Sequence, residues 1–171
     1  MQEPAVPEIH WFTTAYVVGE DRLRFACALK SGGSDVFWLT QRLANALVKR
    51  LLDWLDKQTG HEGRSAAIAH RVAQQSATAK PPQRPAGQIP AAPGWLARNV
   101  GVGTMKKTVL LTFKDEAEHA LCIRFDAQHL RRWLKVLHAQ YHRSGWPTDI
   151  WPDWIADCAE TPAPVHSGLL H

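Results

Sequence analysis

The chain has 171 residues, 45% hydrophobic and 21% charged, a length that supports one domain with a substantial core or two very small ones. Its three cysteines are an odd number without a CxxC pair, which suggests neither a disulfide framework nor a zinc knuckle, and its first residues show no basic and apolar leader. No run approaches about 18 apolar residues, so we expect a cytoplasmic protein without a membrane span.

The formal net charge of +4 is spread unevenly. Residues 1–56 carry 6 basic and 7 acidic side chains, residues 57–114 carry 9 and 1, and residues 115–171 carry 5 and 8. A basic middle segment is typical of polyanion-binding proteins, and also of a solvated linker rich in lysine and arginine. The charge pattern leaves both interpretations open.

Residues 1–60 predict three strands followed by a helix. Aromatic and β-branched residues are dense over Ile9–Val18, and Arg22–Lys30 alternates with the period of two that marks a strand with one buried face. A short strand, Val36–Leu39, runs into a helix that Thr40 caps and whose apolar residues recur every three or four positions.

Residues 61–94 separate this unit from the next. Glu62–Lys80 is rich in alanine and glutamine and predicts a weakly amphipathic helix. Pro81–Gly94 contains five prolines, which predicts an extended linker because proline fixes φ and lacks an N–H donor.

Residues 95–146 predict a second unit of the same kind. Thr108–Lys114 and His119–Phe125 suit a hairpin, and Asp126 caps a helix that ends near Gly145. Offsets of 84 in the strands and 86 in the helices align the two units. We therefore expect an α+β protein in which internally duplicated β-β-β-α units form one antiparallel sheet, with two long helices packed on one face and pseudo-twofold symmetry.

Residues 147–171 form a tryptophan-rich tail. Trp151 and Trp154 lie in this tail and Trp146 directly precedes it, so that three tryptophans fall within nine residues. Because that much apolar area is costly to leave in water, we expect the tail to dock on the body of a single structural domain.

Few residues show a spacing that catalysis requires. His138 and His142 lie at i and i+4 of a helix and can bind zinc from one face, but no third ligand is evident near them. The mid-strand cysteines Cys27 and Cys122 are expected to pack as small hydrophobes. We therefore expect a non-enzymatic chain without a cofactor, with a metal-dependent enzyme as a second alternative.

Basic and aromatic residues carry the strongest binding signal. Lysine and arginine neutralise phosphates while exposed aromatic rings stack on bases, and an open sheet face showing Trp11, Trp38 or Trp95 would suit a single strand. The duplicated sheet-plus-helix plan is broadly similar to that of Whirly-type single-strand binding proteins, although no motif of that family is matched. The candidate binding residues are Arg42, Lys49, Arg50, Arg98, Lys106, Lys107, Arg131, Arg132, Trp151 and Trp154.

Tryptophan and arginine also dominate the energetics of protein interfaces. We therefore expect a binding or assembly module that contacts a protein partner or a second copy of itself. Single-stranded nucleic-acid binding is the alternative.

Overall fold

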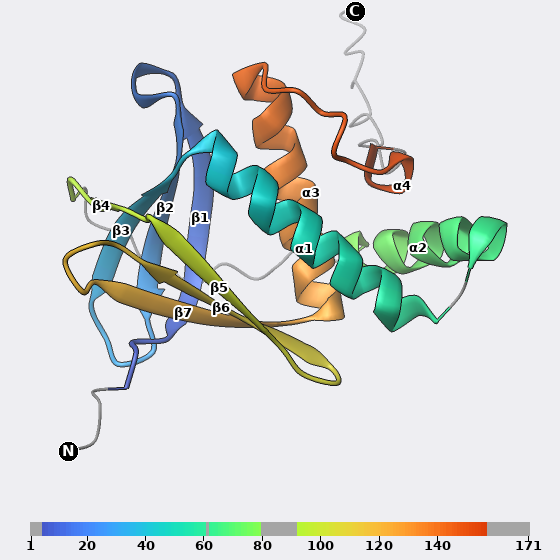
Figure 1. The fold of residues 1–171 in the computed structure, drawn as a ribbon, viewed down its shortest axis with the longest axis horizontal. Coiled ribbons are helices and arrows are strands. Elements are labelled where there is room, and N and C mark those ends of the chain that lie inside the picture. The colour runs from blue at the N-terminus through green and yellow to red at the C-terminus, as the bar shows by residue number, and fades with distance from the viewer. Residues whose placement is uncertain (1–4, 61, 80–91, 157–171) are drawn as a thin grey trace, which may run out of the picture.

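A computed structural model describes residues 5–60, 62–79 and 92–156. Its strands are β1 (Ile9–Val17), β2 (Arg22–Leu29), β3 (Ser34–Leu39), β4 (Trp95–Leu96), β5 (Asn99–Thr104), β6 (Thr108–Lys114) and β7 (Ala120–Asp126). Its helices are α1 (Gln41–Thr59), α2 (Gly63–Thr78), α3 (Ala127–Ser144) and the single turn α4 (Asp153–Ala156), and a 3-10 turn, η1, covers Val18–Glu20. The α+β class is confirmed. In Figure 1 the strands gather on one side of the molecule and the helices on the other.

The strands form two sheets, so the expected single sheet is wrong. One sheet has the order β1-β2-β3-β4, with β4 parallel to β3, and the other is the antiparallel meander β5-β6-β7. Each sheet is apolar on one side, and the two apolar sides face one another. The rings of Phe37 and Phe113, one from each sheet, lie 4.6 Å apart. Face-to-face packing buries both apolar sides at once, which an edge-to-edge junction would not.

The segment 95–104 passes from the first sheet to the second. The backbone N–H of Ala97 donates to the carbonyl of Trp38 at 3.0 Å, and that of Arg98 donates to the carbonyl of Lys114 at 2.8 Å. The same stretch of chain therefore pairs first with the outer edge of β3 and then with the outer edge of β6. Neither of these two strand edges is left unpaired at this corner.

A second junction lies at the opposite corner of the sheets. Glu8, just before β1, forms a parallel bridge with Cys122 of β7, and the N–H of Cys122 donates to the carbonyl of Pro7 at 3.0 Å. The sheets thus meet at two corners, with the aromatic core between them.

The helices α1 and α3 each follow a meander directly. The side chains of Thr40 and Asp126 accept hydrogen bonds from the backbone N–H three residues on, at 3.3 and 2.8 Å, as predicted for N-caps. Helix α1 packs against β5, and α3 packs against β1 and β7. Each helix therefore contacts a strand of the sheet that does not directly precede it in sequence. The Tyr141 hydroxyl donates to Asn45 Oδ1 at 2.6 Å and joins α3 to α1.

Helix α2 lies within the segment for which a weakly amphipathic helix was predicted; it has 16 residues and packs against α3 and α4. It makes three long helices, where the sequence predicted two. Most of the expected proline-rich linker and the end of the expected tail lie outside the described residues. None of the described helices combines the length and apolar content that crossing a bilayer requires.

Candidate functional site

The eight tryptophans of the chain divide by environment. The buried ones, at most 7% exposed, are Trp54, Trp133, Trp146, Trp151 and Trp154. Trp95 is half-buried and packs against the core. Trp11 and Trp38 are partly exposed and belong neither to the core nor to its border. These two indoles are therefore the tryptophans that are candidates for a role other than core packing.

Strand register places both indoles on one surface. Trp38 of β3 lies opposite Arg24 of β2, which lies opposite Ala15 of β1, and Trp11 of β1 lies opposite Ala28 of β2. These residues alternate with the core residues, so they point away from the second sheet. We call this surface the first outer face, and it comprises Trp11, Thr13, Ala15, Val17, Arg22, Arg24, Ala26, Ala28, Ser34, Val36 and Trp38.

The first outer face is positively charged. Arg22 and Arg24 are its only charged residues, and neither forms an ion pair with another described residue. Asp21, the carboxylate next to Arg22 in sequence, is occupied elsewhere. Asp21 accepts hydrogen bonds from the Tyr16 hydroxyl at 2.7 Å and from Trp146 Nε1 at 3.1 Å. The face therefore has two guanidinium groups with no carboxylate among them.

The segment before β4 borders this face beside Trp38. Trp38 Nε1 donates to the carbonyl of Pro93 at 2.9 Å, which fixes the edge of the indole. Gly94 has a φ of +75°, and a Cβ there would lie 2.7 Å from Val36 Cγ1. Only glycine permits so close an approach, and this approach helps to explain why Val36 is buried in the middle of the face.

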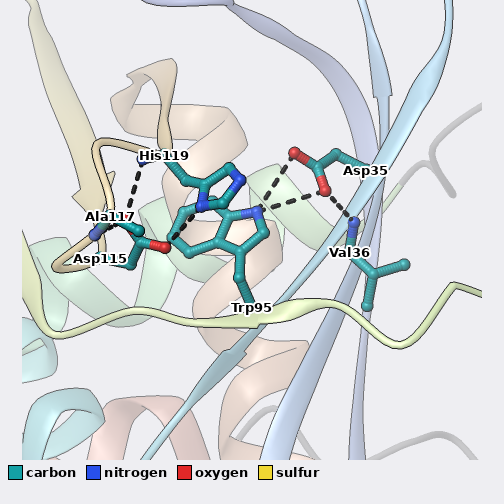
Figure 2. A network of polar contacts seen from close by, with 6 residues as sticks. All are labelled: Asp35, Val36, Trp95, Asp115, Ala117 and His119. Atoms are coloured by element: carbon teal, nitrogen blue, oxygen red, sulfur yellow. Dashed lines mark hydrogen bonds and ion pairs between the residues drawn. The ribbon is translucent and has the colours of Figure 1, made fainter.

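Trp95, in contrast, packs against the core (Figure 2). Its ring stacks on Phe37 with ring centroids 5.3 Å apart. It also stacks on His119 with ring centroids 5.7 Å apart, as Figure 2 shows. Asp35 accepts from Trp95 Nε1 through both carboxylate oxygens at 3.2 Å, and Asp115 holds His119 at 2.5 Å. Trp95 thus closes one end of the space between the sheets and is not available for stacking from solvent.

The second sheet also has an outer face, with a different character. It contains Gly101 and Gly103 of β5, Leu110 of β6, and Arg124 of β7. Lys106 and Lys107 project from the adjoining turn and are exposed. No aromatic residue stands on this face among the described strands, so it offers charge without a stacking surface.

Six of the predicted binding residues are exposed, but the structure does not bring them to the first outer face. Arg42, Lys49 and Arg50 lie on the solvent side of α1. Arg98 lies 4.0 Å from Glu116, and the turn lysines Lys106 and Lys107 belong to the second sheet.

The other four predicted binding residues are used inside the molecule. Arg131 is 4% exposed, and its Nη2 lies 3.0 Å from His70 Nδ1. Because a guanidinium only donates, His70 Nδ1 must accept, which places the imidazole proton on Nε2, 2.8 Å from Asp56 Oδ1. Burial, and then the neighbouring Arg131, lower the pKa of His70, although Asp56 opposes this. The ring of Trp154 stacks on His70 at 4.5 Å and lies 5.0 Å from the Arg131 guanidinium carbon.

Arg132 and Trp151 are structural as well. Arg132 Nε donates to the carbonyl of Ala77 at 2.5 Å and holds the end of α2 against α3. Trp151 packs edge-on against Tyr141 at 5.2 Å. The expectation that Arg131, Trp151 and Trp154 present a binding surface is therefore corrected, because all three are at most 7% exposed. Arg132 is partly buried and bonded to α2.

His138 and His142 do come together, with ring centroids 4.6 Å apart. Burial, and then the neighbouring His142, lower the pKa of His138. Among the described residues no group of three histidine, cysteine or carboxylate side chains is placed to hold a metal ion. The pair alone offers a metal only two ligands, where zinc sites use at least three.

Sequence reasoning missed Arg22 and Arg24. The signal was present, because both occupy the polar positions of the alternating strand Arg22–Lys30 and were therefore predicted to face away from the core. What the sequence did not reveal was that Trp38 lies in the same row as Arg24.

No family model matches the chain, and no curated protein or solved structure resembles it significantly.

Proposed function

We propose that the chain is a non-enzymatic binding module that holds single-stranded nucleic acid on its first outer face. The observation that carries the proposal is that Trp11 and Trp38, the two tryptophans outside the core and its border, share one sheet face with Arg22 and Arg24. Indoles stack on any base, and guanidinium groups neutralise phosphates, which is the combination that grips single strands without reading sequence. A duplex hides its bases inside its stack and would offer such a face only its phosphates.

An internal duplication would account for the relation between the two sheets. Leu23 pairs with Leu39 in the first sheet as Val109 pairs with Phe125 in the second, so a single offset of 86 relates strands, N-caps and helices alike. We propose that the halves are diverged copies related by an approximate twofold axis, and the reciprocal packing of α1 on β5 and α3 on β1 fits this.

The two copies differ on their outer faces. At the same offset Trp38 corresponds to Arg124, so a stacking residue in one copy is a charged residue in the other. The first copy would hold bases, and the second would contribute charge alone.

Fluorescence anisotropy with a labelled oligothymidylate tests the function. The expected result is binding at low salt that weakens steeply as the salt concentration rises. Neutralisation of the phosphates by arginine releases counterions from the nucleic acid, and this release favours binding less at higher salt. Arg22→Gln with Arg24→Gln should weaken binding, whereas Arg42→Gln with Arg50→Gln on α1 removes the same charge and should matter less. Absence of binding at low salt refutes the proposal.

Assembly through a protein partner or a second copy is the competing outcome. If no oligonucleotide binds and light scattering shows a dimer that Trp11→Ala dissociates, the first outer face is a protein interface. A reducing location such as the cytoplasm remains part of the proposal, and it is consistent with the free thiols of Cys27 and Cys122.

A further inference from the structure

The spacing of the two indoles on the first outer face is set by the sheet. Trp11 and Trp38 lie on the strands that flank β2, and their partners on β2, Ala28 and Arg24, are four residues apart. Strands lie about 4.8 Å apart and rise about 3.3 Å per residue, so the two α-carbons are about 10 Å apart across the sheet and about 13 Å along it. The direct separation is therefore about 16 Å.

This separation exceeds the reach of neighbouring bases. A stacked strand advances about 3.4 Å per nucleotide, so about five steps cover the distance, and a strand stretched between the indoles covers it in fewer. One dinucleotide can therefore meet only one indole. An oligonucleotide of about four to six residues can meet both.

The exposed surface between the indoles lies along β1. Thr13 and Ala15 of β1 are small and exposed, whereas Ala26 of β2 and Val36 of β3 are only 3% and 1% exposed, so a strand would follow the β1 side of the face rather than cross its centre. Arg24 stands in the row of Trp38 and hence within the span, while Arg22 stands two residues further along β2 and outside it.

We infer that the first outer face grips a single strand at two points, stacking one base on Trp11 and another on Trp38 about three to five nucleotides apart, with Arg24 on the phosphates between them. This inference rests on the proposed function and adds to it a minimum ligand length and a distinct role for each arginine. Two linked contacts act as one because the second forms at the high local concentration that the first creates.

Oligothymidylates of two, four, six and ten nucleotides, titrated at low salt by anisotropy, test the inference. Affinity should rise about five- to hundredfold between two and six nucleotides, the range expected for gaining one stacked base, and only slowly beyond. Trp11→Ala and Trp38→Ala should each abolish the rise, while Trp11→Phe, which keeps a stacking ring, should retain most of it. Far-UV circular dichroism checks that each variant is folded.

The arginines provide a matched pair of variants of equal charge. With the six-nucleotide ligand, Arg24→Gln should reduce the dependence of log affinity on log salt by about 0.7, the value for one phosphate contact on a single strand, and Arg22→Gln should change it less.

The outcomes separate the inference from the function. A rise with length that persists in both tryptophan-to-alanine variants, or equal effects of the two arginines, overturns the two-point grip while binding itself stands. Failure of every oligonucleotide to bind the unmodified chain overturns the proposed function as well.

Discussion

Removal of Trp154 should destabilise the fold by about 3 kcal/mol without affecting nucleic-acid binding. Trp154 is 7% exposed, stacks on His70 at 4.5 Å and lies 5.0 Å from the Arg131 guanidinium carbon. Truncation of a buried tryptophan to alanine costs about 3–5 kcal/mol. The lower end applies because α4 is a single turn that can settle toward α2 and α3 and fill part of the space.

The assay is urea unfolding followed by far-UV circular dichroism, which does not depend on the fluorescence of the missing residue. A loss of about 3 kcal/mol corresponds to a fall in Tm of about 6–12 °C for a chain of this length. The same substitution at Trp11 is the matched control, and it should cost clearly less stability than Trp154→Ala because Trp11 is partly exposed and lies outside the core.

The two variants should then exchange roles in the oligonucleotide titration. Trp11→Ala should weaken binding, and Trp154→Ala should leave the affinity of the folded protein unchanged. Equal stability losses in the two variants would refute the division of the tryptophans into core and face residues. So would a loss of oligonucleotide affinity in the folded Trp154→Ala protein.

Three further predictions concern stability and reactivity. Burial lowers the pKa of His70 and of His138 in the folded state. Because histidine in the unfolded chain titrates near about 6.5, the unfolded chain binds more protons than the folded protein as the pH falls through this value. The urea midpoint should therefore decrease between pH 7 and pH 5.5 and stay constant between pH 8 and pH 7. A midpoint that is flat down to pH 5.5 would contradict this. Thr40→Ala and Asp126→Ala should each cost about 1 kcal/mol in urea unfolding through loss of an N-cap, with Asp126→Asn costing less; an alanine variant as stable as the parent would show that the cap contributes nothing. Burial raises the pKa of the Cys27 thiol to about 12, so a thiol reagent at pH 8 should leave it unmodified in the native protein and modify it in urea, as peptide mass spectrometry can establish; rapid native labelling would mean that the strand opens readily.

Local structure was predictable because it depends on local patterns. The alternation over Arg22–Lys30 predicted a strand, the three-to-four spacing after Thr40 predicted a helix, and both N-caps were identified from residue type. The arrangement of the sheets was not predictable in the same way. A period of two tells which side of a strand is apolar, but not whether that side faces helices or another sheet.

The alignment of the two halves illustrates the same limit. Strand residues were matched at an offset of 84, whereas the pairing of Leu23 with Leu39 and of Val109 with Phe125 corresponds to 86. A slip of two residues leaves every side chain on the same face, so hydrophobic alternation cannot detect it. Only hydrogen-bond register distinguishes the two.

The residue types of the candidate site were predictable from the sequence, but their positions in the fold were not. Composition indicated that arginine and tryptophan were important, but it could not separate Trp11, which is outside the core, from Trp154, which is inside it. Arg131 follows a buried leucine on α3 and looks solvent-facing by spacing. It is buried because α2, distant in sequence, packs over it.

The short strand β4 has a consequence for how the chain folds as it is synthesised. The edge of β3 that Trp95 and Leu96 complete is exposed once residue 39 has emerged, and it stays exposed until residues more than fifty positions later are made. Pairing over such a separation is slow because a long loop must close first. The N-terminal half released alone would present an unpaired strand edge beside an uncovered aromatic surface, which is the usual starting point for aggregation. The two halves are therefore expected to reach the native state together, and neither should survive as a separate fragment.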